Sequence, residues 1–221
     1  MSLQYLQNYF EGFQVPVFPL AIIIITGALI LRFKVRKIDK TDRETAQEFW
    51  IRESEANATR AVDVSTLEYL EVPCDELPLH ATVTDENPAG DEDAEECARI
   101  IEAIAEKKVK NLTGLTNTDL KLQYGAANLD FLSRCDENFT ILTTTLNRLA
   151  LRLDDLGYTG EAKTLAEYAV ETGSDIKQTY LLLGKYYREA DDQFRFQQLK
   201  YNAENLNSLM KDSIIRELEE S

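Results

Sequence analysis

Residues 143–210 repeat themselves, and this repeat constrains the fold more than any other feature of the sequence. A shift of 34 positions aligns two copies of one pattern: a large residue, then leucine and a small residue, then a second large residue. This period is typical of stacked two-helix units, because each unit buries its apolar face only against its neighbours. The aligned pairs are Leu146 with Tyr180, Leu149 with Leu183, Ala150 with Gly184, Leu153 with Tyr187, and Ala169 with Ala203.

The repeated residues resemble the tetratricopeptide repeat, in which a large-x-x-Leu-Gly-x-x-Tyr pattern is followed by a turn and two alanine contacts. Gly157 stands at the turn of the first unit, and Ala162 and Ala169 stand at the alanine positions. The resemblance implies an all-α domain of stacked helix pairs, wound as a right-handed αα-superhelix. We expect this domain over 94–221, with repeats at about 143–176 and 177–210. The departures from the pattern are Ser174 for the usual closing proline, Asp191 for the turn glycine of the second unit, and Phe196 for a small residue.

In this family the first helix of each unit lines a concave groove that binds a partner protein or peptide. From their positions in the repeat pattern, we expect Thr144, Asp154 and six further contact residues to face such a groove. Lys185 and Arg188 would bind a carboxylate of the partner; the alternative is that they are solvated surface charges. The lysine and asparagine arrangement that holds a C-terminal carboxylate in family members is not reproduced here. The six contact residues are Asn147, Leu151, Gln178, Leu181, Lys185 and Arg188.

Residues 15–31 carry no charge and are rich in isoleucine. A helix rises about 1.5 Å per residue, so this run crosses most of a hydrocarbon core of roughly 30 Å. We predict a transmembrane helix over 15–33 after a short head over 1–14, with Pro16 and Pro19 where a first turn tolerates proline. A cleaved signal peptide is a competing interpretation, but no basic head precedes the run and no cleavage site follows it. A buried core helix is the other alternative.

Five basic residues follow this run, whereas Glu11 is the single charge before it. Basic residues beside a span are retained in the cytoplasm. We therefore expect a single-pass protein of the cell membrane, with its N-terminus outside and its C-terminal domain in the cytoplasm. The basic residues can also contact anionic lipid head groups. They are Arg32, Lys34, Arg36, Lys37 and Lys40.

Residues 34–61 join this basic segment to an amphipathic helix, predicted over 42–60. We expect Trp50 to pack against other residues of the protein, with a partner contact as the alternative. Through the span, the Phe49-Trp50-x-Arg-Glu helix and the repeats, the chain is similar to uncharacterised membrane proteins of Gram-positive bacteria. That resemblance implies a bacterial source and no particular activity.

Residues 62–93 are an extended and acidic segment. Alternating apolar residues and two prolines predict an extended chain over 62–79. We expect it to lie along the helical domain as an internal ligand, because its apolar side chains would otherwise be exposed to water. The alternative is an exposed recognition peptide. Residues 80–93 are polar and acidic, which predicts a flexible loop or linker.

A helix is predicted over 95–110, with three lysines in its last turn, where cations interact favourably with the helix dipole. These lysines are Lys107, Lys108 and Lys110. The following residues, 111–128, contain two glycines and several capping residues, which predicts a long loop.

A short helix is expected over 129–134, before Asp136 caps the first repeat helix. At the other end of the chain, a helix over 206–219 is predicted to cover the open face of the last repeat. Leu209 and Met210 belong to its apolar side in this prediction.

The net charge of −15 comes mainly from one stretch, since residues 61–98 hold twelve acids and no Lys or Arg. A nucleic-acid partner is disfavoured, because phosphate binding needs clustered cations. The acids over 91–96 invite a calcium site, but their spacing does not match the calcium-binding loop of EF-hand proteins. A solvated acidic run is the favoured interpretation.

Residues suited to catalysis are scarce. His80 is the single histidine, and Cys74 lies six positions before it, without a third orienting group. No Gly-rich phosphate loop is present. Cys74, Cys97 and Cys135 are odd in number and fit no metal spacing, which favours free thiols in a reducing compartment. We therefore expect no metal, no cofactor and no enzymatic activity.

These features predict a membrane-anchored, non-enzymatic scaffold or adaptor that binds a partner protein or peptide on the cytoplasmic side. One alternative keeps the repeats but places them outside the cytoplasm, as an assembly factor for the envelope or for secretion. A second alternative is a membrane-bound enzyme that uses Cys74 or the acidic residues.

Overall fold

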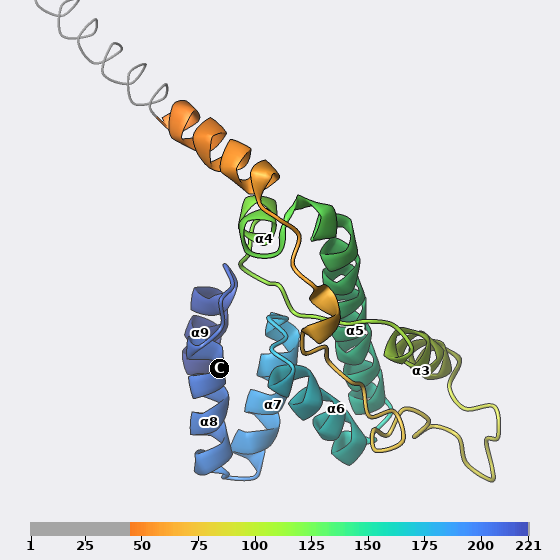
Figure 1. Cartoon of the computed structure of the whole chain (residues 1–221). Helices are drawn as coiled ribbons and strands as arrows, with labels where there is room; N and C mark the ends of the chain where they lie inside the picture. The colour runs from red at the N-terminus through yellow and green to blue at the C-terminus, as the bar shows by residue number, and fades with distance from the viewer. Residues whose placement is uncertain (1–44, 221) are drawn as a thin grey trace, which may run out of the picture. The chain divides into compact units, whose positions relative to one another are not determined.

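The computed structural model describes residues 45–220, and the chain divides into two compact units, Met1–Glu55 and Ala56–Ser221 (Figure 1). Within the described residues the only strand-like pairing is one isolated bridge, so the predicted all-α class is confirmed. Two 3-10 turns, η1 (Val64–Thr66) and η2 (Ala126–Asn128), accompany the helices of the second unit. These helices are α3 (Glu92–Ala105), α4 (Asn117–Tyr124), α5 (Leu129–Asp155), α6 (Thr159–Glu171), α7 (Lys177–Glu189), α8 (Gln193–Glu204) and α9 (Lys211–Glu220).

A helix over 45–58 begins in the first unit. Phe49 and Trp50 are 53% and 66% exposed, and their rings meet edge to face at 5.6 Å. The expectation that Trp50 is packed is therefore wrong, because its indole meets Phe49 and is otherwise largely open to solvent. The predicted head, membrane span and basic segment fall within 1–44, outside the described residues. Within 45–220, no helix is both long enough and apolar enough to cross a membrane.

α5 is the central helix of the second unit, with α3 packed on one side of it and α6 on another (Figure 1). Its inner face carries Leu142, Leu146, Leu149 and Leu153, all fully buried. Their spacing of three and four residues places them on one side of the helix. Burial of each leucine contributes about 1.5–3 kcal/mol, which makes this face the centre of the core.

The start of α5 differs from the prediction of a short helix followed by a cap at Asp136. A single helix runs from Leu129 through that position, and the Asp136 carboxylate accepts a hydrogen bond from the backbone N–H of Leu112 at 2.9 Å. Asp136 therefore fixes the preceding loop to α5 instead of starting a helix. A short polar side chain can serve either purpose, which is why its sequence position alone misled the prediction.

The helices of the two sequence repeats pack in chain order. α5 contacts α6, α6 contacts α7, and α7 contacts α8. The residues aligned by the repeat are buried in both copies, as Leu146 and Tyr180 show with no exposed surface. Tyr180 also donates a hydrogen bond from its hydroxyl to the backbone carbonyl of Ser174 at 3.0 Å. The repeat in the sequence thus corresponds to equivalent core positions.

Three consecutive helices end in the same left-handed turn. Gly157 after α5 and Gly173 after α6 have φ values of 88° and 86°, and Asp191 after α7 has a φ of 52°. Aspartate is among the few other residues that tolerate this conformation. In the second turn the backbone N–H of Ser174 donates to the carbonyl of Ala169 at 3.0 Å. A proline at position 174 would lack that N–H and could not form this hydrogen bond.

Segment 62–79 lies against the helical core, and it is extended only in part, because η1 occupies 64–66 and a turn occupies 74–76. Leu70, Val72 and Leu77 pack on the core, and Leu79 is 2% exposed. The hydroxyl of Tyr168 on α6 donates to the carbonyl of Glu71 at 3.3 Å. The prediction that this segment serves as an internal ligand of the helical domain is confirmed by this packing.

The predicted flexible loop over 80–93 is instead anchored to α3. Thr82 is 3% exposed, and its hydroxyl accepts a hydrogen bond from the backbone N–H of Asp91 at 3.0 Å. The same hydroxyl donates to Glu95 at 3.1 Å. α3 also begins at Glu92, three residues earlier than predicted. The polar and acidic composition of 80–93 indicated a flexible loop, because composition does not reveal the hydrogen bonds that hold Thr82.

The next segment also differs from its prediction. α3 ends at Ala105, so Lys107 and the lysines that follow it lie beyond the helix. Residues 111–128 are not a plain loop, because they contain α4 and η2. Thr116 and Asp119 form a reciprocal capping box at the start of α4, in which each side chain bonds to the backbone of the other.

α9 covers α7 and α8, as a terminal helix of a stack should. Its Ile214 and Leu218 are buried, and a Cβ atom on Gly184 would lie 2.9 Å from the Leu218 side chain. Gly184 thus permits a close approach of α9 to α7. Leu209 and Met210 precede this helix and are exposed, Leu209 fully, so their assignment to the apolar side was wrong.

Candidate functional site

Five of the six expected groove residues lie along one face formed by α5 and α7. Asn147 is 8% exposed and links the two helices. Its carbonyl oxygen accepts a hydrogen bond from the hydroxyl of Thr179 at 2.9 Å, and its amide nitrogen donates to Gln178 at 3.3 Å. Gln178 itself is exposed. The α5–α7 face, as we use the term, comprises Asn147, Leu151, Asp154, Gln178, Leu181 and Lys185.

Further along the same face, Asp154 joins the two helices a second time. Its carboxylate accepts a hydrogen bond from the hydroxyl of Tyr186 at 2.7 Å and lies 3.3 Å from Nζ of Lys185. Burial and this hydrogen bond raise the pKa of Tyr186. The side chain of Lys185 remains 51% exposed, so it can exchange Asp154 for a carboxylate of a partner.

The structure does not bring all six expected residues together. Leu151 and Leu181 are half-buried and pack against the core. The Arg188 guanidinium turns toward α8, where it lies 4.9 Å from the ring centroid of Phe196, and its Nε donates to the carbonyl of Gly184. Arg188 is therefore separated from Lys185, because stacking on an aromatic ring holds its long side chain elsewhere.

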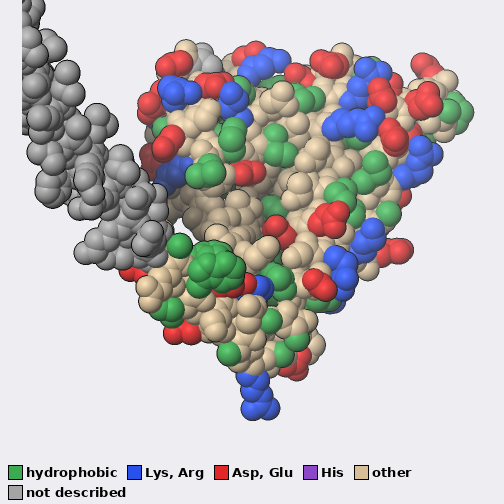
Figure 2. Space-filling model, turned by 90° about the horizontal axis from the view of Figure 1, so that it is seen from above, with side chains coloured by type: hydrophobic (Ala, Val, Ile, Leu, Met, Phe, Trp, Pro, Cys, Tyr) green, Lys and Arg blue, Asp and Glu red, His purple; other side chains and the backbone are tan. Residues whose placement is uncertain are grey.

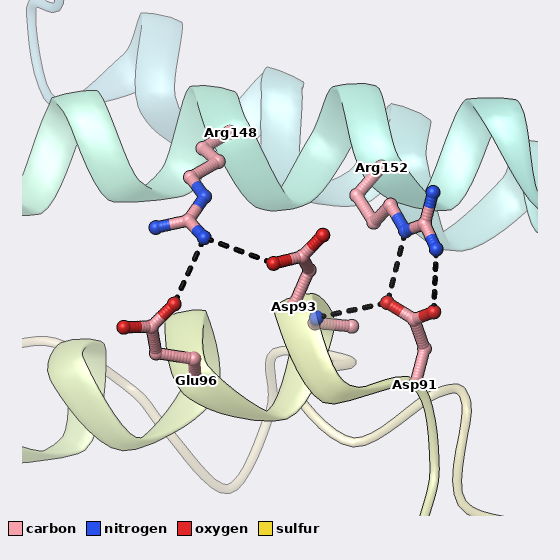
Figure 3. Close-up of polar contacts among 6 residues, drawn as sticks. Asp91, Asp93, Glu96, Arg148 and Arg152 are labelled. Carbon is pink, nitrogen blue, oxygen red and sulfur yellow. Dashed lines mark hydrogen bonds and ion pairs between the residues drawn. The ribbon is translucent and has the colours of Figure 1, made fainter.

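The acidic run at the start of α3 is paired with two arginines of α5 (Figure 3). Arg148 bonds to Asp93 at 3.2 Å and to Glu96 at 2.8 Å, and Arg152 bonds to both oxygens of Asp91 at 2.9 and 2.6 Å. The Arg152 guanidinium lowers the pKa of Asp91 to about 2. The sequence interpretation of a merely solvated run missed these pairs. The signal that could have found them is the spacing of four between two arginines on a predicted helix.

His80 lies between two carboxylates of α3. Nδ1 is 2.6 Å from Glu95, and Nε2 is 3.0 Å from Glu102. Both nitrogens can donate only when the ring is an imidazolium. Hydrogen bonds to Glu102 and Glu95 accordingly raise the pKa of His80.

The thiols show no sign of activation. Cys74 forms no hydrogen bond with His80, and burial raises its pKa. Cys97 and Cys135 are buried, unpaired in disulfides, and also have their pKa raised by burial. A raised pKa keeps a thiol protonated and unreactive near neutral pH. Residues 45–220 contain no cluster of metal-binding side chains.

A cleft of about 380 Å³ lies among α6, α7 and α8. Glu167 accepts hydrogen bonds there from Tyr187 and from Arg195, both at 2.7 Å. Phe194, which also lines this cleft, is 79% exposed. Over the face shown in Figure 2, hydrophobic side chains occur in small groups among acidic and basic ones.

No family, curated protein or solved structure matches this chain.

Proposed function

We propose that the chain is a membrane-anchored, non-enzymatic adaptor whose tetratricopeptide-like helices bind a partner protein or peptide on the cytoplasmic side. The observation that supports this proposal best is the α5–α7 face. α7 presents an exposed amide, Gln178, and a half-exposed ammonium, Lys185, and α5 of the other repeat contacts both of them through Asn147 and Asp154. Such groups bind main-chain amides and carboxylates of peptides.

The anchor rests on residues 15–33 and on the basic cluster that follows them. Three unpaired cysteines favour the cytoplasmic placement of the body over the extracytoplasmic alternative, because disulfides form in oxidising compartments. We propose that the source is bacterial, from the resemblance to membrane proteins of Gram-positive bacteria. Cys74 has no catalytic role in this proposal.

Site-specific photo-crosslinking in cells tests the proposed face. A photoreactive residue replaces Gln178 in the full chain, and we expect it to yield a discrete crosslinked protein. The Lys185→Ala substitution should reduce that crosslink by at least about tenfold, since it removes the charge that holds the partner.

Lys200→Ala is the matched control, because Lys200 also forms an exposed-surface ion pair between two helices, with Glu219 at 2.9 Å. It should leave the crosslink unchanged. Equal losses with Lys185→Ala and Lys200→Ala would contradict the proposed face, and so would the absence of any crosslink from position 178.

A further inference from the structure

Two aromatic side chains are more than half exposed on the helix over 45–58, namely Phe49 and Trp50. Because their positions are adjacent, they lie about 100° apart around the helix axis. Ala46 and Glu53 share this side of the helix, since each is three residues from one aromatic position and four from the other. We call these four residues the aromatic face.

The other charged residues of this helix lie away from the aromatic face. Glu48, Arg52 and Glu55 are exposed and fall on the opposite side of the helix. Glu53 alone places a carboxylate beside the rings, and it is partly buried. A face that combines aromatic rings with a carboxylate suits the head-group layer of a bilayer, where apolar and polar groups mix. It does not suit the acyl core, where a charge is costly.

The indole of Trp50 suits the head-group layer too. Its N–H forms no hydrogen bond within residues 45–220, so it can donate to a phosphate or ester oxygen of a lipid. Tryptophan is enriched at membrane–water interfaces, because its ring is apolar and its N–H is polar. Trp50 therefore has the chemistry of a residue that contacts lipid.

The sequence before the helix places it close to a bilayer. The predicted span ends at residue 33, twelve positions before Thr45, and a chain of that length reaches at most roughly 43 Å. Lys40 is the last residue of the basic cluster, and five residues further on the helix has begun. Contact of Lys40 with anionic head groups would hold Thr45 within about 18 Å of the surface.

We propose that the aromatic face lies in the head-group layer of the membrane, with Phe49 and Trp50 inserted among the lipids. This inference rests on the proposed membrane anchor, and it does not involve the α5–α7 face. The attraction is apolar, because the helix over 45–58 holds three acids and one arginine and gains nothing from anionic lipid. Insertion therefore occurs equally well in a zwitterionic bilayer.

The fluorescence of Trp50 tests the proposal directly, because it is the one tryptophan of the chain. The full chain is reconstituted without detergent in phosphatidylcholine vesicles whose acyl chains carry bromine near the head-group end. Bromine quenches tryptophan on contact, so we expect a loss of at least about half of the emission relative to vesicles without bromine. Bromine at the far end of the acyl chains should quench less, since the ring stays near the surface.

The matched control moves the tryptophan by one position, in the double variant Trp50→Phe, Ile51→Trp. Ile51 is 52% exposed, as on the aromatic face, but it lies about 150° from the middle of that face. Bromine should remove less than about a fifth of its emission, because it points away from the lipids.

A second pair of variants tests the partner ring. Phe49→Asp should reduce the quenching of Trp50 by at least about half, because it places a charge where the face enters the membrane. Ile51→Asp makes the same change of charge on the other side of the helix and should leave the quenching unchanged. Both positions are exposed, so neither variant should unfold the chain.

Flotation of the same vesicles separates the inference from the anchor. A chain that does not float with the vesicles refutes the anchor, and the inference falls with it. A chain that floats while bromine quenches positions 50 and 51 alike overturns the inference alone, as would equal effects of Phe49→Asp and Ile51→Asp. Blue-shifted emission without quenching by bromine would show that a protein surface covers Trp50, which also overturns the assignment to lipid.

Discussion

His80 shows how a single residue can tie a loop to a helix. Its two ring nitrogens contact Glu95 and Glu102, which lie two turns apart on α3. The ring is held in its charged form, because only an imidazolium donates to both carboxylates. The groups that face the ring are these two acids, and Thr82 bonds to Glu95 beside them. The loop over 80–90 is therefore attached through an imidazolium whose pKa is raised by its hydrogen bonds to Glu102 and Glu95.

The His80 contact should make stability depend on pH. Its pKa is raised in the folded state, so its contribution is complete below the unfolded value of about 6.5 and is lost as pH rises through the higher folded value. We expect His80→Gln to lower the Tm at about pH 6 and to have little effect at about pH 9. Thermal melts of the full chain in detergent, followed by circular dichroism, measure this. An equal drop at both pH values would mean that the ring acts through packing and not through its charge.

Substitutions at Gly157 and Gly160 distinguish the cost of backbone strain from the cost of a steric clash. Gly157 has a φ of 88°, Gly160 lies within α6, and neither has an atom within 4 Å of an added Cβ. Gly157→Ala should destabilise the fold by about 1 kcal/mol, because a left-handed conformation is costly for alanine. Gly160→Ala should stabilise it by up to about 1 kcal/mol, because alanine favours a helix. Denaturant midpoints of the two variants should therefore move in opposite directions, and a shift in the same direction would refute this account of the turn.

At the scale of elements, backbone hydrogen bonds determine where the helices end, whereas side-chain contacts determine how their faces pack. The turns after α5, α6 and α7 share one hydrogen-bond pattern, although the third uses Asp191 in place of glycine. The junction of α3 with α5 depends on apolar burial together with the Arg148 and Arg152 ion pairs. Those pairs are partly exposed, so they set the register of the two helices more than they stabilise them.

The terminal helix offers a matched pair of leucines. Leu218 of α9 is 1% exposed against Gly184, and Leu209 just before the helix is fully exposed. Leu218→Ala should cost about 2–5 kcal/mol through lost burial and a cavity. Leu209→Ala should change stability by less than about 0.5 kcal/mol. Chemical denaturation of the full chain in detergent compares them, and similar midpoints for the two variants would show that α9 is not packed as described.

For the whole molecule, the distribution of charge is more informative than the total of −15. Three acids of the acidic stretch are used internally, in the pairs that join α3 to α5. The exposed end of Lys185 is a place where we propose that charge serves a partner. The proposed anchor would hold the α5–α7 face near the membrane, which makes sidedness the central question for the intact protein.

Sidedness can be measured with single cysteines in a chain whose Cys74, Cys97 and Cys135 are replaced by serine. Leu209→Cys supplies a thiol at a fully exposed position of the body, and Ser2→Cys supplies one in the head. A membrane-impermeant maleimide should label position 2 in intact cells and position 209 only after lysis. Labelling of position 209 in intact cells would favour the extracytoplasmic alternative. Full exposure of Leu209 excludes burial as the reason for a lack of label.

The sequence by itself determined the all-α class, the equivalent core positions of the two repeats and the packing of segment 62–79 on the helical core. Periodicity specifies these features, because each residue's environment follows from its near neighbours on the same helix or strand. Only the tertiary structure decided which distant groups meet: Arg152 with Asp91, His80 with Glu102, and Arg188 with Phe196. Such contacts depend on how whole helices are placed, and a long charged side chain has several partners within reach until that placement selects one.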